Sequence, residues 1–222
     1  MSTCDKRLEK HINLLISRYP VLEVVRQDII DGYCLLEETY KNGGKLLVAG
    51  NGGSAADAEH IVGELMKRFK LPRPVSSDFA EKLKQADSVR GAELVRNLEQ
   101  ALMAIPLTCH EALTTAYIND VDGHGTFAQQ LFGYGVKGDV FLGISTSGNS
   151  KNILAATVVA RAAGIKVLGL TGAKGGELAT VADVTVKVPE TETYMVQELH
   201  LPIYHCWCLM LEDKFFGKEE NA

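Results

Sequence analysis

A cluster of hydroxyl side chains follows an apolar segment near the middle of the chain. Residues 141–144 are apolar and of strand length, residues 145–150 read S-T-S-G-N-S, and a helix-like pattern begins after them. Hydroxyls and free backbone N–H groups at a helix N-terminus, where the macrodipole is positive, suit a dianion such as a phosphate monoester. The hydroxyls in question belong to Ser145, Thr146, Ser147 and Ser150.

A second loop of similar design lies earlier in the chain. Residues 45–49 read as a strand, residues 50–53 (G-N-G-G) as a turn, and Ser54 opens a helical segment. The motif satisfies one form of the dinucleotide fingerprint, which also requires a second strand ending in Asp or Glu about 20 residues further on. Residues 67–74 read K-R-F-K-L-P-R-P and cannot form that strand, so we expect no nucleotide cofactor.

A turn that merely reverses the backbone stays open as an alternative for residues 50–53. Two glycine- and hydroxyl-bearing loops in one short chain favour a phosphorylated small molecule, and we count Ser54 among the residues that bind it.

Two pairs of polar residues have helical spacing. His60 and Glu64 are four apart and share one helix face, so they could hold one metal ion or one substrate, although a solvated surface pair has the same spacing. Gln197 and His205 are eight apart, an offset of about 80° on a helix, so both could line one groove. Read alone, His205 lies in an apolar run that favours a core histidine over a site residue. His200 lies about 140° from His205 and is left out of the site.

Alternating segments of strand and helix length indicate the scaffold for these residues. They predict an α/β fold with a mostly parallel sheet, in which ligands bind beyond the carboxyl ends of the strands. The expected strands are residues 45–49, 105–109, 139–144, 165–170 and 184–188. The expected helices lie in 5–42 (broken at Tyr19-Pro20), 54–69, 76–103, 110–119, 127–134, 149–163 and 192–216.

Bulk properties exclude several classes of function. The 222 residues carry a net charge of −5, which gives no general attraction to nucleic acid or to an anionic membrane. No apolar run approaches the ~20 residues that span a bilayer, and no signal peptide is expected at the N-terminus. Five scattered cysteines are typical of reduced thiols, and we expect a cytoplasmic protein. Cys206 and Cys208 are two apart, so on a helix they point away from each other and are poor candidates for one metal.

The order of these motifs resembles the SIS (sugar isomerase) domain. Within that group the chain is most similar to the phosphoheptose isomerases, over most of residues 1–75 and 105–217. The resemblance implies one SIS domain over residues 1–222, a parallel-sheet α/β/α sandwich of flavodoxin- or Rossmann-like type. Residues 1–42 would be N-terminal helices and 76–103 a helical insertion. It also implies a homotetramer with active sites at subunit contacts and often a zinc ion.

The resemblance assigns a role to each matching residue. Glu64 and His205 would transfer protons between the carbons and oxygens of a sugar phosphate, interconverting sedoheptulose 7-phosphate and D-glycero-D-manno-heptose 7-phosphate through an enediol(ate). The metal ligands would be His60, Glu64, Gln197 and His205. The sugar would be held by Asn51, Gly52, Gly53, Asn119 and Asp120, with Glu64 and Gln197 also in contact, and the phosphate by Ser145, Thr146, Ser147 and Ser150.

Two departures from the family pattern leave alternatives open. The insertion at 76–103 is longer than the usual link, and Tyr194 stands where these enzymes tend to carry an acidic residue. An isomerase of another sugar phosphate shares every residue argument. A non-catalytic sensor or adaptor, of the type that associates with the replication initiator, is a third reading. The presence of both Glu64 and His205 favours an enzyme.

Overall fold

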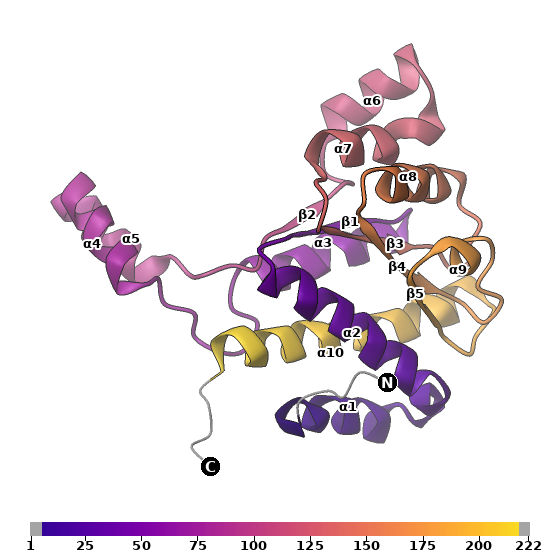
Figure 1. Ribbon diagram of the computed structural model, residues 1–222, viewed down its shortest axis with the longest axis horizontal. Helices are drawn as coiled ribbons and strands as arrows, with labels where there is room; N and C mark the ends of the chain where they lie inside the picture. The colour runs from indigo at the N-terminus through magenta and orange to yellow at the C-terminus, as the bar shows by residue number, and fades with distance from the viewer. Residues whose placement is uncertain (1–5, 218–222) are drawn as a thin grey trace.

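A five-stranded parallel sheet forms the centre of the computed structural model, which describes residues 6–217 (Figure 1). The strand order is β2-β1-β3-β4-β5, and every neighbouring pair is parallel. The strands are β1 (Leu46–Ala49), β2 (Ala104–Pro106), β3 (Val140–Ile144), β4 (Lys166–Thr171) and β5 (Val184–Lys187). This architecture confirms the predicted α/β fold, and the order places β1 and β3 side by side.

Helices cover both faces of the sheet because the central strands are apolar on both sides. Helices α2, α3 and α10 pack on the face that carries Val48 and Leu142, with α1 packed on α10 and α2, whereas α7, α8 and α9 pack on the face that carries Leu47 and Phe141. The helices of the first layer are α1 (Lys6–Arg18), α2 (Arg26–Lys41), α3 (Gly53–Met66) and α10 (Thr193–Phe216). The remaining helices of the body are α6 (Glu111–Asp120), α7 (Thr126–Tyr134), α8 (Lys151–Ala162) and α9 (Leu178–Val181).

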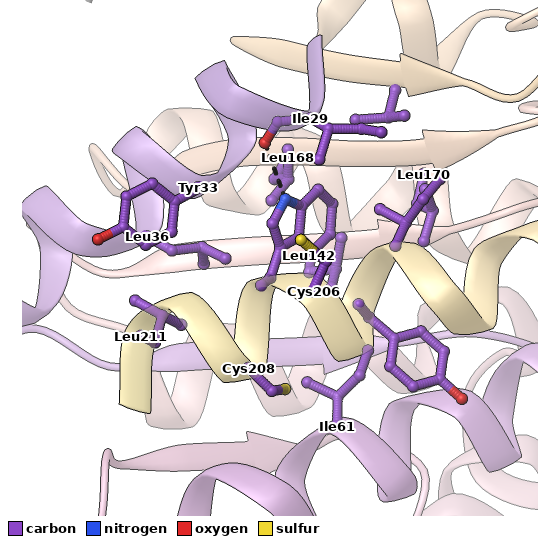
Figure 2. Packing of buried hydrophobic residues seen from close by; sticks show 14 of the residues in the cluster. Ile29, Tyr33, Leu36, Ile61, Leu142, Leu168, Leu170, Cys206, Cys208 and Leu211 are labelled. Atoms are coloured by element: carbon purple, nitrogen blue, oxygen red, sulfur yellow. Dashed lines mark hydrogen bonds between the residues drawn. The ribbon is translucent and has the colours of Figure 1, made fainter. Parts of the chain in front are cut away.

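The long C-terminal helix α10 is the main support of the first layer. Figure 2 shows Cys206 and Leu211 of α10 in the buried cluster that also contains Leu36 of α2 and Leu142 of the sheet. The Trp207 indole is buried and donates its Nε1–H to the Ile29 carbonyl at 2.9 Å, so its polar atom is satisfied inside the core. This packing fixes the rotation of α10 and hence the direction of its polar side chains. No helix within residues 6–217 is long and apolar enough to cross a membrane.

Several expected element boundaries differ from the structure. Helix α3 ends at Met66 rather than at 69, because the backbone N–H groups of residues 69–71 donate to the Glu212 side chain of α10. The break at Tyr19-Pro20 introduces a 3-10 helix, Pro20–Val25, as proline is favoured at a first helical turn. The strand expected at 105–109 spans only Ala104–Pro106, and the short helix α9 was not expected.

The helical insertion forms a hairpin that projects from the body (Figure 1). Its helices are α4 (Ser77–Ala86) and α5 (Ser88–Asn97), each begun by a side-chain cap, from Ser76 and Asp87 respectively. Gly91 is the one buried residue of the pair. A Cβ at Gly91 would lie 2.1 Å from the Leu83 carbonyl oxygen, so glycine allows the two helices to touch.

A buried ion pair anchors the segment between α3 and this hairpin. The Arg73 guanidinium lies 2.9 Å from a Glu212 oxygen, and both side chains are almost completely buried. Glu212 also accepts hydrogen bonds from the backbone N–H groups of Phe69, Lys70 and Leu71. The chain after α3 is therefore tied to the C-terminal part of α10.

Candidate active site

Two loops meet at the carboxyl ends of the adjacent strands β1 and β3. Asn51, in the loop after β1, and Asn152, in the first turn of α8, exchange two amide hydrogen bonds of 3.0 and 2.8 Å. Because β1 and β3 are paired in parallel, the loops that follow them leave the same edge of the sheet. The two segments predicted to hold one ligand are therefore brought together.

The hydroxyl-rich loop, residues 145–150, brings several side-chain hydroxyls to the start of α8. Ser145 Oγ and Ser150 Oγ are 2.9 Å apart. Ser150 occupies the N-cap position, yet its side chain makes no capping hydrogen bond to the helix. The exposed Ser147 and the half-buried Thr146 complete the loop. The Ile153 N–H donates to the Asn152 side chain at 3.0 Å, whereas the N-cap side chain caps none of the first N–H groups. A helix N-terminus of this kind with adjacent hydroxyls is suited to bind an anion.

Gly148 of this loop packs closely against the backbone of Gly175. Gly148 has a φ of 68°, and a Cβ at this position would lie 1.9 Å from the Gly175 carbonyl oxygen. The side chain of Asn149 accepts a hydrogen bond from the Glu177 N–H at 2.9 Å. Only glycine tolerates both the backbone conformation and the close approach, so the loop is held rigid against residues 172–178.

The α3–α10 contact brings the other predicted residues together. The Gln197 side chain lies on Gly53, where a Cβ would come within 2.7 Å of its Nε2. His60 Nε2 lies 3.4 Å from Glu64 Oε1 and 3.5 Å from His205 Nε2. Residues almost 150 positions apart in sequence thus share one site. Glu64 Oε2 also accepts a hydrogen bond from the exposed Lys67 ammonium at 3.1 Å.

Two further polar residues contact this group. The Tyr204 hydroxyl donates to Asp57 Oδ1 at 3.0 Å and lies 3.1 Å from His60 Nδ1. Burial raises the pKa of the Asp57 carboxyl and of the Tyr204 hydroxyl above their ordinary values. Partial burial, with a contribution from His60, lowers the pKa of His205, which favours a neutral imidazole that can exchange protons.

The donor types partly fit a zinc site. Two ligand atoms of a tetrahedral zinc with bonds of about 2.0–2.1 Å lie roughly 3.3 Å apart. The separations of 3.4 Å for His60–Glu64 and 3.5 Å for His60–His205 are close to this value. Within residues 6–217, however, no three His, Cys, Asp or Glu side chains are already arranged as a complete set of metal ligands. The donor types and the His60–Glu64 and His60–His205 distances thus suit zinc, but the side chains do not yet surround a single metal position.

Some predicted residues lie apart from this group. Asn119 and Asp120 are exposed at the end of α6, where Asn119 Nδ2 donates to Asp120 Oδ1 at 2.8 Å. Helix α6 packs on α7, away from α3 and α10 (Figure 1). One chain alone therefore does not bring these two residues to Glu64. Ser54 is buried beneath the loop after β1, where its N–H donates to the Asn51 carbonyl at 3.0 Å.

Sequence reasoning did not name Asp57, Tyr204 or Asn152. A usable signal existed for Asp57, which precedes His60 by three residues and so shares its helix face. Tyr204 sits in an apolar run, where nothing in the spacing marks it as a partner of α3. Asn152 lies just beyond the hydroxyl-rich loop, and its contact with Asn51 depends on the strand order.

His200, which the sequence analysis left out of the site, lies in the core. Its side chain is fully buried, and burial lowers its pKa to about 4 against a smaller opposing effect of the Thr171 backbone. Because the unfolded chain has the ordinary pKa of about 6.5, it binds more protons than the folded protein between these values.

We therefore expect the free energy of unfolding to fall by up to about 3 kcal/mol as the pH drops from about 6.5 to about 4. Urea titrations over this range measure the change. The variant His200→Gln should flatten this part of the pH profile, and an identical slope in both proteins would rule out His200 as its source.

Known proteins match the chain in both sequence and structure. The SIS domain family model matches residues 95–172. A phosphoheptose isomerase 2 of Campylobacter jejuni is 42% identical over 181 residues, which cover 82% of this chain and 77% of that protein. A phosphoheptose isomerase of Aneurinibacillus thermoaerophilus is 41% identical over 179 residues, covering 81% and 77%.

A solved structure of phosphoheptose isomerase from Neisseria gonorrhoeae superposes with a TM-score of 0.71 at 29% identity, covering 94% of this chain and 98% of that one. One from Francisella tularensis gives a TM-score of 0.73 at 28% identity, covering 93% and 97%. The relatives and the solved structures match far more of the chain than the residues 95–172 that the SIS domain model covers. The chain therefore belongs to the phosphoheptose isomerase family of SIS-domain sugar-phosphate isomerases.

Proposed function

We propose that this enzyme interconverts sedoheptulose 7-phosphate and D-glycero-D-manno-heptose 7-phosphate. The observation that carries the proposal is the approach of the Glu64 carboxylate and the His205 imidazole to the same atom, His60 Nε2. A carboxylate base and a neutral imidazole are the groups that an aldose–ketose isomerisation requires. Membership of the family supports the choice of a seven-carbon sugar.

In the proposed mechanism Glu64 moves the carbon proton. Its carboxylate removes a proton from C1 of the ketose, and the electron pair forms the C1–C2 double bond of an enediol(ate). The protonated Glu64 then returns the proton to C2. His205 carries the proton of the C1 hydroxyl to the C2 oxygen, so that the aldehyde forms at C1 and a hydroxyl at C2. Groups placed in this way typically contribute about 10²–10⁴ in rate.

Binding of the distant phosphate supplies further help by orienting the sugar. The hydroxyls of Ser145, Thr146, Ser147 and Ser150 and the first N–H groups of α8 would hold it. Asn51, Gly52, Gly53 and Gln197 would contact the sugar hydroxyls. The support for this assignment is the amide pair of Asn51 and Asn152, which fixes the two loops at one edge of the sheet.

Replacing Ser150 by alanine should weaken substrate binding more than chemistry. A hydrogen bond to a charged group contributes about 1.5–3 kcal/mol, so KM should rise about 10- to 100-fold with a much smaller change in kcat. Steady-state kinetics measure both constants. Ser77→Ala, at the start of α4 on the hairpin, is the matched control and should leave them unchanged. An unchanged KM in the Ser150 variant would contradict the phosphate assignment.

We also propose that a zinc ion binds to this enzyme, held by His60, Glu64 and His205 with Gln197 as a weaker fourth ligand. The pair distances around His60 Nε2 support the choice of ligands. When bound, such an ion would polarise the substrate carbonyl as a Lewis acid.

A homotetramer would complete the site. Asn119 and Asp120 lie away from Glu64 in one chain, and α6, α7 and α8 expose the apolar side chains of Ile118, Phe132 and Val158. Exposed apolar patches of this kind mark interaction surfaces. Sedimentation equilibrium should give four times the 24.1 kDa mass of one chain. A monomer would contradict the proposal.

A cytoplasmic location is consistent with the thiols. Cys34, Cys109, Cys206 and Cys208 form no disulfide within the described part of the chain.

A panel of sugar phosphates tests the proposed reaction. Purified protein is incubated with sedoheptulose 7-phosphate and with five- and six-carbon ketose phosphates, while turnover and binding are measured in parallel. Preferred turnover of the seven-carbon substrate supports the proposal. Preferred turnover of a shorter sugar would reassign the substrate, and binding without turnover of any would favour the sensor function.

A further inference from the structure

A chain of two hydrogen bonds connects a half-buried carboxylate to one of the histidines of the site. The Tyr204 hydroxyl donates to Asp57 Oδ1 at 3.0 Å, and the same hydroxyl oxygen lies 3.1 Å from His60 Nδ1. Asp57 and His60 are three residues apart on α3, whereas Tyr204 reaches them from α10. The connection therefore exists only when the two helices are packed together.

The direction of these hydrogen bonds determines where the proton on His60 resides. A tyrosine hydroxyl has one proton, and an ionised Asp57 carboxylate can only accept, so the Tyr204 proton is donated to Asp57 Oδ1. The Tyr204 oxygen can then only accept from His60, so His60 Nδ1 must carry a proton. In a neutral imidazole the other nitrogen then has a free lone pair. That nitrogen, Nε2, is the atom that lies nearest to Glu64 and His205.

The packing around Tyr204 keeps this arrangement in place. Tyr204 is only 1% exposed, so water does not compete for its hydroxyl. Its ring packs edge-on against the rings of His60 and His205, with centroid distances of 5.5 and 5.1 Å. The phenol thus restrains both the proton position and the ring orientation of His60.

We propose that Asp57 and Tyr204 are positioning residues that hold His60 as the Nδ1-protonated tautomer, with its Nε2 lone pair directed into the active site. The ligand this device serves is a divalent, nitrogen-seeking cation such as zinc, because metal-binding histidines are oriented by a partner on the other ring nitrogen. The metal part of this inference rests on the proposed function. The tautomer part stands on the hydrogen bonds alone.

The tautomer can be measured directly in the wild-type protein without metal. Long-range 1H–15N spectra of histidine side chains distinguish protonated from unprotonated ring nitrogens, and the variant His60→Gln assigns the signals of His60 by their disappearance. At a pH of about 8, above the ordinary histidine pKa of about 6.5, we expect a protonated Nδ1 and an unprotonated Nε2. A protonated Nε2 in the wild type would overturn the proposal.

The variant Tyr204→Phe removes the acceptor while retaining the ring. We expect mixed tautomers at His60 in the spectrum and zinc affinity about 10- to 100-fold weaker in a competition with a chromophoric chelator. Tyr40→Phe is the matched control, because the buried Tyr40 hydroxyl donates only to the Met103 carbonyl, at 3.2 Å. Unchanged tautomer and zinc affinity in Tyr204→Phe would overturn the assignment of Tyr204.

These measurements separate this inference from the proposed function. If the wild type fails to isomerise any sugar phosphate but shows the Nδ1-protonated tautomer, the positioning role holds and the proposed reaction is wrong. If it isomerises the seven-carbon substrate but His60 is protonated at Nε2, the reaction holds and the positioning role is wrong.

Discussion

Replacing Glu64 by glutamine should lower kcat by about 10²- to 10⁴-fold or more while leaving the binding of the sugar phosphate nearly unchanged. Glutamine has almost the same shape and can still form hydrogen bonds, but its amide cannot accept the carbon proton. Steady-state turnover measures the first effect, and calorimetric titration with the substrate measures the second. The loss belongs to the chemical step, as expected for a group that acts in the transition state.

Glu59→Gln provides the control for this prediction. Glu59 lies on the same helix and is exposed. It accepts a hydrogen bond from Thr108 at 3.1 Å, away from His60 and His205. Its replacement should leave kcat within about twofold, as expected of a surface substitution away from the site. If the Glu64 variant lost substrate binding and turnover in parallel, Glu64 would be a binding residue and the role of base would be wrong.

The largest effect on stability is expected from Glu212→Ala. This change leaves the Arg73 guanidinium buried without its charge partner and removes the acceptor of three backbone N–H groups. Breaking a buried pair from one side costs about 3–5 kcal/mol, against a total stability of about 5–15 kcal/mol for a typical protein. Urea denaturation measures the loss. Asp78→Ala, which breaks the exposed pair of Asp78 and Lys82, should cost at most about 1 kcal/mol.

A double variant separates the two contributions of Glu212. Replacing both Arg73 and Glu212 by methionine removes the unpaired charge, but the N–H groups of residues 69–71 still lack their acceptor. We expect the double variant to be more stable than Glu212→Ala and less stable than the wild type. Equal stability of Glu212→Ala and the wild type would show that the pair does not anchor the segment after α3.

The Arg73 side chain of this ion pair also contacts the helix that carries Glu64. Arg73 donates to the carbonyl of Leu65 at 2.8 Å and to that of Glu64 at 3.3 Å, both in the last turn of α3, and the Leu65 carbonyl also accepts the Leu102 N–H at 3.0 Å. The guanidinium therefore ends the helix at the turn that carries Glu64. Its contacts explain why α3 stops at Met66, three residues before the end expected from the sequence.

Local patterns were enough to predict the sheet and most helices. The apolar run at 139–144 forms a central strand because both faces of a parallel sheet are buried, and it reads as strand from its length and its flanking loop. The short α9 escaped prediction because four residues carry no helical period. The early end of α3 depends on Arg73 and Glu212, which are 139 residues apart, so no local pattern reports it.

The candidate site was likewise predicted only where its residues have a local sequence pattern. His60 and Glu64 share a helix face that spacing alone reveals, and the hydroxyl-rich loop has a local signature. The approach of His205 to His60 requires α10 to cross α3, and the family resemblance rather than spacing paired them. Tyr204 was missed because its role depends on Asp57, to which only the packed helices bring it.

Conversion of sedoheptulose 7-phosphate by the purified wild-type protein in deuterium oxide, followed by NMR, tests the central claim most directly. We expect the aldose 7-phosphate to accumulate and to carry deuterium at C2, because the proton taken up by Glu64 exchanges with solvent before it is returned. The Glu64→Gln variant should form no product. Ketose that remains unchanged although the protein binds it would contradict the account and identify the chain as a sugar-phosphate-binding protein.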